Sequence, residues 1–337
     1  MAVDTGALPI INLDDYINAK SPADKERVIA EVRDASKKYG FFQVKGHGIP
    51  LKAQEGLIRG LGNLFHQSEE EKAKLSFLKN PGRRGYEASG VGGLRAGDAM
   101  HDSKEAFYIG REDPVLEPPG FYGPNVWPNL PEEECRSLIW EYYQGTSVLG
   151  RIIWAILLQG LGYSADLLDD FAKRPIVQMK MIRYPPASLT KPGQFGVGAH
   201  TDFGGVTVLL QEPAKAGLEV QDSETKEWLP VPSIEDVLVI NCGDMIQKWS
   251  GGAYKSAKHR VINKADTERF SCATFWHGDA SAANPLNADD DDKDTIGQLL
   301  FKRFKSQFSL PKEAKDQPQG VAPHPNESGM PQQVEVQ

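Results

Sequence analysis

The hydrophobic period of the chain changes near residue 176, and this change limits the fold more than any other feature. Upstream, apolar side chains recur at helical spacing, as in 28–35 after the helix-start signal Ser21-Pro22. Downstream, short runs rich in valine, isoleucine, threonine and aromatic residues alternate with turn signals. Many short strands with close turns are typical of a β-sandwich or barrel, so we expect a mainly β core with flanking helices.

The elements expected before the β core are strands at 8–12 and 40–50 and helices after Ser21, at 51–66 and at 131–162. Between them, residues 78–130 are rich in glycine and proline, and we expect little regular structure there. A loop of this length inside a compact domain is usually functional or disordered, and its aromatic and charged residues favour function.

The expected organisation is one domain at 1–310, followed by a tail. The domain comprises an N-terminal region with the long loop at 1–175, a β core at 176–280 and a closing segment at 281–310 with a helix at 296–308. The tail at 311–337 holds five prolines and ends in polar residues, so we expect it to be disordered.

Composition excludes several classes of protein. The 337 residues carry a net charge of −8 without a long basic stripe, which argues against nucleic acid as a partner. No apolar run reaches the roughly 18 residues that a membrane-spanning helix needs. Residues 1–10 lack the basic and apolar regions of a signal peptide, and three distant cysteines form no disulfide or zinc pattern. We therefore expect a cytoplasmic protein with a small-molecule partner, of unknown oligomeric state.

The segment Gly198–Gly204 carries the strongest chemical signal. Residues i and i+2 of an extended chain point to one face, so His200 and Asp202 project together. His259, at the start of another β-like run, is a candidate third ligand. Two histidines and one carboxylate form the facial arrangement of non-haem Fe(II) oxygenases, which leaves positions for a bidentate co-substrate and O2. A His-x-Asp pair alone is more often exposed or hydrogen-bonded, so this prediction depends on its context.

Arg269 and Ser271 supply that context. They share one face of a predicted strand shortly after His259. A guanidinium pairs bidentately with a carboxylate, and a hydroxyl adds a further donor. Arg269 alone would indicate a surface ion pair. Beside metal ligands, Arg269 and Ser271 together predict an anchor for an acidic co-substrate.

Together these residues resemble the iron(II)/2-oxoglutarate-dependent dioxygenases of the isopenicillin N synthase-like class. The similarity extends over roughly residues 8 to 305, and its motifs are specific for the class but not for the substrate. The matching segments are LPIINL at 8–13, GFFQVKGHGIP at 40–50, RYPP at 183–186, GAHTDFGGVTVLLQ at 198–211, GLEVQ at 217–221, NCGDMIQKWSGGAYKS at 241–256, HRV at 259–261 and RFS at 269–271.

The resemblance implies a double-stranded β-helix, which is a jelly-roll, cupin-like core. It assigns Fe(II) binding to His200, Asp202 and His259, and 2-oxoglutarate binding to Arg269, Ser271 and Tyr184. Some members have an asparagine two positions before that tyrosine, where this chain has Ile182.

The implied reaction is oxidation of a small organic molecule by hydroxylation, desaturation or ring closure, with release of succinate and CO2. It uses O2, with ascorbate as an optional supporting reductant. The resemblance to fungal and bacterial members suggests secondary metabolism or nucleobase-type oxidation.

Substrate recognition is expected from residues around this core. The predicted substrate-binding residues are Arg84, Tyr86, Lys104, Phe107, Asn125, Phe275 and His277, with Glu87, Glu105, Tyr108 and Trp127 as neighbours. For each loop residue, packing over the barrel mouth is the common alternative. Phe275 alternates with Ser271 and is expected to face the metal, with Trp276 on the other side of the sheet.

Two alternatives to a 2-oxoglutarate-dependent enzyme remain open at this point. One is an oxidase of the same fold that needs no 2-oxoglutarate and uses its Arg-x-Ser pair for another carboxylate. Succinate production would distinguish the 2-oxoglutarate-dependent enzyme from this oxidase. The other is a metal-free binding protein, which loss of a ligand would favour. A zinc hydrolase would need an HExxH helix, and the sequence has none.

Overall fold

A computed structural model describes residues 8–80, 82–90, 100–112, 121–286 and 294–307. The chain divides into two units, Met1–Leu300 and Phe301–Gln337, and the first contains every strand of the described residues. The predicted tail at 311–337 lies outside the described residues. The predicted single domain at 1–310 therefore stays a prediction.

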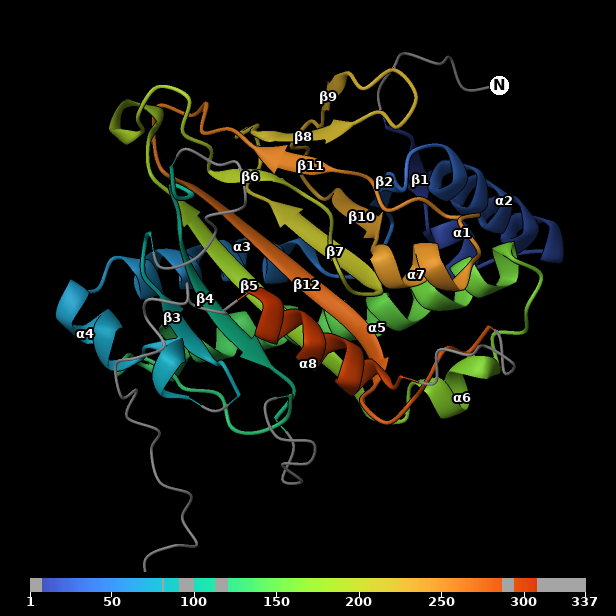
Figure 1. Ribbon diagram of the computed structural model, residues 1–337, viewed down its shortest axis with the longest axis horizontal. Coiled ribbons are helices and arrows are strands. Elements are labelled where there is room, and N and C mark those ends of the chain that lie inside the picture. The colour runs from blue at the N-terminus through green and yellow to red at the C-terminus, as the bar shows by residue number, and fades with distance from the viewer. Residues whose placement is uncertain (1–7, 81, 91–99, 113–120, 287–293, 308–337) are drawn as a thin grey trace, which may run out of the picture. The chain divides into compact units, whose positions relative to one another are not determined.

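Two β-sheets form the centre of the first unit (Figure 1). In the described residues, the large sheet has the strand order β1-β2-β10-β7-β12-β5-β4-β3, and the small sheet has the order β6-β11-β8-β9. The strands are β1 Ile10–Asn12, β2 Phe41–Lys45, β3 Gly85–Glu87, β4 Glu105–Gly110, β5 Pro175–Tyr184, β6 Val197–His200, β7 Val206–Gln211, β8 Leu218–Gln221, β9 Trp228–Pro230, β10 Leu238–Cys242, β11 His259–Val261 and β12 Arg269–Asp279. Only β1 and β2 pair in parallel among these strands. The mainly β core expected from the change of period is confirmed.

The described residues form helices at the four predicted places, after Ser21, at 51–66, at 131–162 and at 296–308, and further short helices that the sequence did not predict. They are α1 Asp14–Ile17, α2 Pro22–Lys38, α3 Leu51–Phe65, α4 Glu69–Lys74, α5 Arg136–Gly160, α6 Leu167–Phe171, α7 Asp244–Trp249 and α8 Ile296–Gln307. Ser21 caps α2, since its Oγ accepts the Asp24 N–H at 3.3 Å, and Pro22 opens the helix. None of the helices in the described ranges is long and apolar enough to span a membrane.

The long helix α5 covers one side of β7 and β12, and the small sheet lies on their other side (Figure 1). Gly150 of α5 packs so closely on Trp276 of β12 that a Cβ would lie 2.4 Å from the indole. Trp154 donates its indole N–H to the Trp276 carbonyl at 3.3 Å. Trp276 therefore points toward the helices, as the alternation of β12 predicts.

The other side of the large sheet faces the small sheet, and we call it the inner face. Ile182 and Tyr184 of β5 pack there in one apolar cluster with Val220 of β8 and Val261 of β11. Because side chains alternate along a strand, the residues between them, such as Met181, point to the opposite, outer face. The candidate site lies between the two sheets, on the inner face.

The expectation of little regular structure at 78–130 is wrong at two places. β4 pairs with β5 from Glu105 opposite Arg183 to Gly110 opposite Gln178, and β3 pairs with β4. Gly85 begins β3 at φ 112°, where a Cβ would lie 2.1 Å from a backbone oxygen. The buried carboxylates of these strands, Glu87 and Glu105, pair with lysine and arginine side chains, and this polar composition hides the period of the strands in the sequence.

Candidate active site

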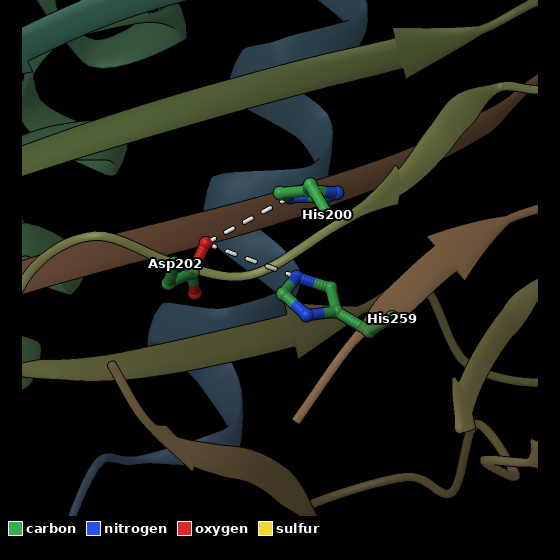
Figure 2. Close-up of side chains that lie close together, drawn as sticks. All are labelled: His200, Asp202 and His259. Carbon is green, nitrogen blue, oxygen red and sulfur yellow. Dashed lines mark ion pairs between the residues drawn. The ribbon is translucent and has the colours of Figure 1, made fainter. Parts of the chain in front are cut away.

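His200, Asp202 and His259 converge between the sheets (Figure 2). His200 ends β6, and His259 begins β11 directly opposite it in antiparallel register. Each histidine Nε2 lies 3.8 Å from Asp202 Oδ1, and the two ring centroids are 4.2 Å apart. One ligand atom from each residue lies within 4.8 Å of the others, which is a spacing that one divalent metal ion could bridge.

Backbone carbonyls orient both imidazole rings. His200 Nδ1 lies 2.9 Å from the Gly198 oxygen, and His259 Nδ1 lies 3.3 Å from the Ala257 oxygen. A proton on Nδ1 satisfies each carbonyl and leaves the Nε2 lone pair directed at the centre of the triad. Phe41 of β2 packs its ring edge-on against His259, with centroids 5.2 Å apart.

In the described residues, hydrogen bonds hold Asp202 through one carboxylate oxygen, Oδ2. Its Oδ2 accepts hydrogen bonds from Thr207 Oγ1 at 2.7 Å and from Asn241 Nδ2 at 2.8 Å. The other oxygen, Oδ1, faces the two histidines. Burial alone would raise the pKa of Asp202, but the charges of His259 and His200 and the two hydrogen bonds outweigh burial and lower it. The carboxylate is therefore ionised and presents one oxygen to a cation.

Arg269 and Ser271 lie beside Tyr184 on the inner face. The Arg269 guanidinium lies 4.9 Å from the Tyr184 ring centroid, and Ser271 Oγ is 3.5 Å from the Tyr184 hydroxyl. Arg269 donates to the Lys215 carbonyl and to Gln211 Oε1, both at 2.9 Å. No carboxylate of the described residues forms an ion pair with it.

The third nitrogen of this guanidinium, Nη1, is buried without a hydrogen-bond partner. Arg269 is only 3% exposed, and burial lowers its pKa. A buried cation without a carboxylate is costly, so a ligand anion would satisfy both the charge and the open donor. The residues therefore fit a dicarboxylate co-substrate that extends from the triad to Arg269.

The predicted substrate residues fall into different surroundings. Lys104 contacts Glu87 on the inner face. Phe107 and Tyr86 lie opposite each other where β3 pairs with β4. Phe107 follows Ala106, which belongs to the apolar cluster on the inner face, so Phe107 and its partner Tyr86 point to the outer face. There the Tyr86 hydroxyl donates to Glu105 at 2.5 Å. Substrate contact by Tyr86 or Phe107 stays a prediction that this geometry does not favour.

Arg84 and Asn125 have structural partners at the end of β4. Arg84 donates to the Phe121 carbonyl at 2.7 Å, and burial lowers its pKa to about 10. The Asn125 amide accepts the Gly110 N–H at 2.8 Å and donates to the Gly110 carbonyl at 2.9 Å. Their proposed role in substrate binding stays a prediction.

Phe275 and His277 of β12 border the triad. Phe275 lies opposite Thr207, the residue that holds Asp202, and shares its face of the sheet. His277 is buried, and its Nδ1 accepts the Gly205 N–H at 3.2 Å. Burial lowers the pKa of His277 to about 4, although the charge of Asp202 acts against this. His277 is thus neutral at physiological pH and supports the loop that follows Asp202.

Sequence reasoning missed Thr207, Asn241 and Lys180. Thr207 and Asn241 pair across β7 and β10, and only this register brings both to Asp202. Asn241 opens the NCGD segment that carries part of the family resemblance, which was the one available signal. Lys180 lies on the inner face of β5 opposite Tyr108 of β4, and predicting this contact required knowing that β4 exists.

Comparison with known proteins identifies the family. Residues 8–130 match the family "non-haem dioxygenase in morphine synthesis N-terminal", and residues 176–278 match the "2OG-Fe(II) oxygenase superfamily". The 2-oxoglutarate-dependent dioxygenase thnC of Trichoderma harzianum is 64% identical over 93% of this chain and 98% of its own length. The 2-oxoglutarate-dependent dioxygenase caaD of Aspergillus niger is 43% identical over 92% of this chain and 97% of its own length.

Solved structures agree on the fold. A full-length Neurospora crassa protein, crystallised in complex with alpha-KG, superposes with a TM-score of 0.78 at 22% identity, covering 91% of this chain and 98% of that one. The chain therefore belongs to the Fe(II)- and 2-oxoglutarate-dependent oxygenases. Membership of this family confirms the predicted jelly-roll fold, enzyme class and cofactors.

Proposed function

We propose that the chain holds Fe(II) with His200, Asp202 and His259, and that Arg269, Ser271 and Tyr184 hold 2-oxoglutarate. The observation that carries this assignment is the buried Arg269 guanidinium, which forms no ion pair with a carboxylate of the described residues. It lies on the inner face of the large sheet, which faces the small-sheet strands that carry His200 and His259. Bound Fe(II), 2-oxoglutarate and O2 would together supply oxidation of a C–H bond, with release of succinate and CO2.

The protein's own residues would perform three tasks. The Nε2 atoms and Asp202 Oδ1 would hold the metal on one side and leave its other side open. Thr207 and Asn241 would keep the second Asp202 oxygen away from the metal. The apolar side chains between the sheets, including Val261 and Val220, would exclude water from the reacting groups.

We further propose a small organic substrate of secondary metabolism and action in the cytoplasm. Fungal relatives support the first point: clavatol oxidase claD of Penicillium crustosum is 33% identical over 90% of this chain and 97% of its own length. Cys135, Cys242 and Cys272, which are buried and free, suit a reducing compartment. The 2-oxoglutarate-independent oxidase is less favoured, because the relatives of highest identity named above are 2-oxoglutarate-dependent enzymes.

Calorimetric titration of 2-oxoglutarate into the Fe(II)-loaded protein under argon tests this assignment. We expect one equivalent to bind per chain, and aerobic samples to release succinate. The His200→Ala variant should lose both the metal and the tight binding. Binding of 2-oxoglutarate that is equally tight in His200→Ala and in wild type would contradict the proposed site.

A further inference from the structure

Gln211, the last residue of β7, is a buried amide with a hydrogen bond at each end. It lies opposite Ser271 of β12 and is only 3% exposed. Its Oε1 accepts a hydrogen bond from Arg269 Nη2 at 2.9 Å, and its Nε2 donates to the Pro232 carbonyl at 3.3 Å. The proposed Fe(II) and 2-oxoglutarate sites give this amide no role, although it contacts the guanidinium that would hold the co-substrate.

The two partners of Gln211 decide which end of the amide faces the arginine. A guanidinium carries donors only, so Arg269 needs the amide oxygen. A proline carbonyl can only accept, so Pro232 needs the amide nitrogen. A flipped amide would oppose donor to donor at one end and acceptor to acceptor at the other. Gln211 therefore presents a neutral oxygen to Arg269.

A second buried amide uses the same carbonyl. Gln43 of β2 is 1% exposed, and its Nε2 donates to the Pro232 carbonyl at 3.1 Å. Gln43 lies opposite Val239 of β10, which lies opposite Leu209 of β7. Because residues i and i+2 of a strand share a face, Gln43 and Gln211 both lie on the inner face. Gln43 is therefore a natural control for Gln211.

The carboxylate that follows Gln211 along the chain is held by other groups. Glu212 Oε1 pairs with Lys215 Nζ at 2.7 Å, and Glu212 Oε2 accepts the Phe270 N–H at 2.8 Å. Its charge favours the protonated form of Arg269, but among the described residues the two side chains form no ion pair. An amide, and not this carboxylate, therefore contacts the guanidinium.

The turn after β7 fixes another edge of the guanidinium. The Lys215 carbonyl accepts the Arg269 Nε–H at 2.9 Å. Ala214, just before it, has a left-handed backbone with φ 61°, and its N–H donates to the Ser233 carbonyl at 3.3 Å. The Tyr184 ring lies 4.9 Å from the guanidinium. In the described residues, two nitrogens thus meet neutral oxygens, and Nη1 is left as the open donor.

We propose that Gln211 is a positioning residue that makes the co-substrate site selective for a keto acid with a second carboxylate. Its neutral oxygen holds the guanidinium in place without forming an ion pair, so Nη1 and the positive charge serve the distal carboxylate of 2-oxoglutarate. In Gln211→Glu, the new carboxylate would form within the protein the ion pair that the ligand should form. This inference rests on the proposed function and deepens it.

Two keto acids that differ in one group test this proposal. 2-Oxoglutarate and 2-oxopentanoate share the chelating end and the chain length, but only 2-oxoglutarate has a distal carboxylate. Calorimetric titration into the Fe(II)-loaded protein under argon gives both dissociation constants, and their ratio measures the anchor. We expect wild type to prefer 2-oxoglutarate by about 10- to 100-fold, and Gln211→Glu to lose most of this preference. Binding of 2-oxopentanoate should change by less than about threefold.

Neutral variants separate charge from packing. Gln211→Met loses both hydrogen bonds but adds no carboxylate, so it should reduce the preference by less than Gln211→Glu does. Gln43→Met loses the matching bond to Pro232, and in the described residues Gln43 forms no hydrogen bond with Arg269, so the preference should not change. Thermal unfolding checks the fold of each variant, and the two methionine variants test the proposal by themselves if Gln211→Glu does not fold.

The outcomes distinguish this inference from the proposed function. A wild-type protein that binds both keto acids equally, or binds neither, would remove the anchor and this inference with it. A preference that persists in Gln211→Glu, or that falls equally in Gln211→Met and Gln43→Met, would overturn the role of Gln211 and leave the proposed function in place.

Discussion

Arg183 and Arg269 lie one register position apart on neighbouring strands, yet their surroundings differ completely. Arg183 points to the outer face and pairs with Glu105 at 2.5 Å and Glu268 at 2.6 Å. Arg269, which lies opposite Tyr184, points to the inner face and has only neutral partners in the described residues. One guanidinium forms two ion pairs within the protein. The other is buried without an ion pair in the described residues, and the nearby charge of Glu212 only favours its protonated form.

This difference separates a structural cation from a functional one. A buried ion pair that the protein completes itself needs no ligand, whereas a buried guanidinium without a carboxylate lowers stability unless an anion binds. Among the described residues, the lack of an ion pair at Arg269, more than its burial, marks the inner face as the binding side.

The largest expected effect is at the triad that Arg269 would serve. His200→Ala or Asp202→Ala should reduce Fe(II)-dependent succinate formation to background, because two ligands hold the metal too weakly. His101→Ala, which removes an exposed histidine outside the triad, should not change it. Succinate assays with thermal unfolding as a fold control measure this, and full activity in either ligand variant would remove the metal assignment.

The next effect compares the two arginines directly. Arg269→Leu should raise the 2-oxoglutarate concentration for half-maximal turnover by about 10- to 100-fold, because a charge-assisted pair is lost. Arg183→Leu should leave this requirement within about threefold of wild type, since Arg183 faces the opposite side of the sheet. Equal shifts in the two variants would show that the difference between the faces has no functional meaning.

The free energy of unfolding should fall more in Arg183→Leu than in Arg269→Leu, which is the opposite order to the effect on 2-oxoglutarate. Arg183→Leu leaves Glu105 and Glu268 without their shared cation, and we expect a loss of about 2 kcal/mol after allowance for its partly exposed side chain. Arg269→Leu removes a buried charge that forms no ion pair in the described residues, so the ligand-free protein should lose less stability or gain some. Urea unfolding without 2-oxoglutarate measures both, and a greater loss in Arg269→Leu would contradict the comparison.

The smallest effect concerns the Glu87 carboxylate and pH. The pKa of Glu87 is lowered from its ordinary 4.5 to about 2, so its contribution to stability is complete above the unfolded pKa and is lost as pH falls toward 2. Between pH 5 and pH 3.5 the stability difference between wild type and Glu87→Gln should shrink by about 1 kcal/mol. Urea unfolding at both pH values checks this, and a constant difference would show that Glu87 is not held as a carboxylate.

The sequence predicted local features of the site better than distant ones. His200 and Asp202 are two residues apart, and Arg269 and Ser271 share a strand, so a period of two placed each pair on one side. The approach of His259 to His200 depends on strand pairing and was supplied by the family resemblance. The residues that hold Asp202 could not be predicted, because they meet only through the register of β7 and β10.

The same limit explains why β3 and β4 were missed and why the predicted substrate residues lie on both faces of the sheet. Composition concealed β3 and β4, because glycine and charged residues there resemble a loop until their buried partners are known. Without the strands, the face of each residue was undefined, so Phe107 and Lys104 received the same prediction although their side chains lie on opposite sides of the sheet. A period of two assigns faces only after the strand itself is recognised.

The most direct measurement is an anaerobic titration of 2-oxoglutarate into the Fe(II)-loaded protein, followed in the visible spectrum. A weak metal-to-ligand charge-transfer band should grow with 2-oxoglutarate in wild type and in Arg183→Leu. In Arg269→Leu it should be absent at the same concentrations. A missing band in wild type with iron bound, or an unchanged titration in Arg269→Leu, would contradict the claim that the buried Arg269 guanidinium on the inner face anchors the co-substrate.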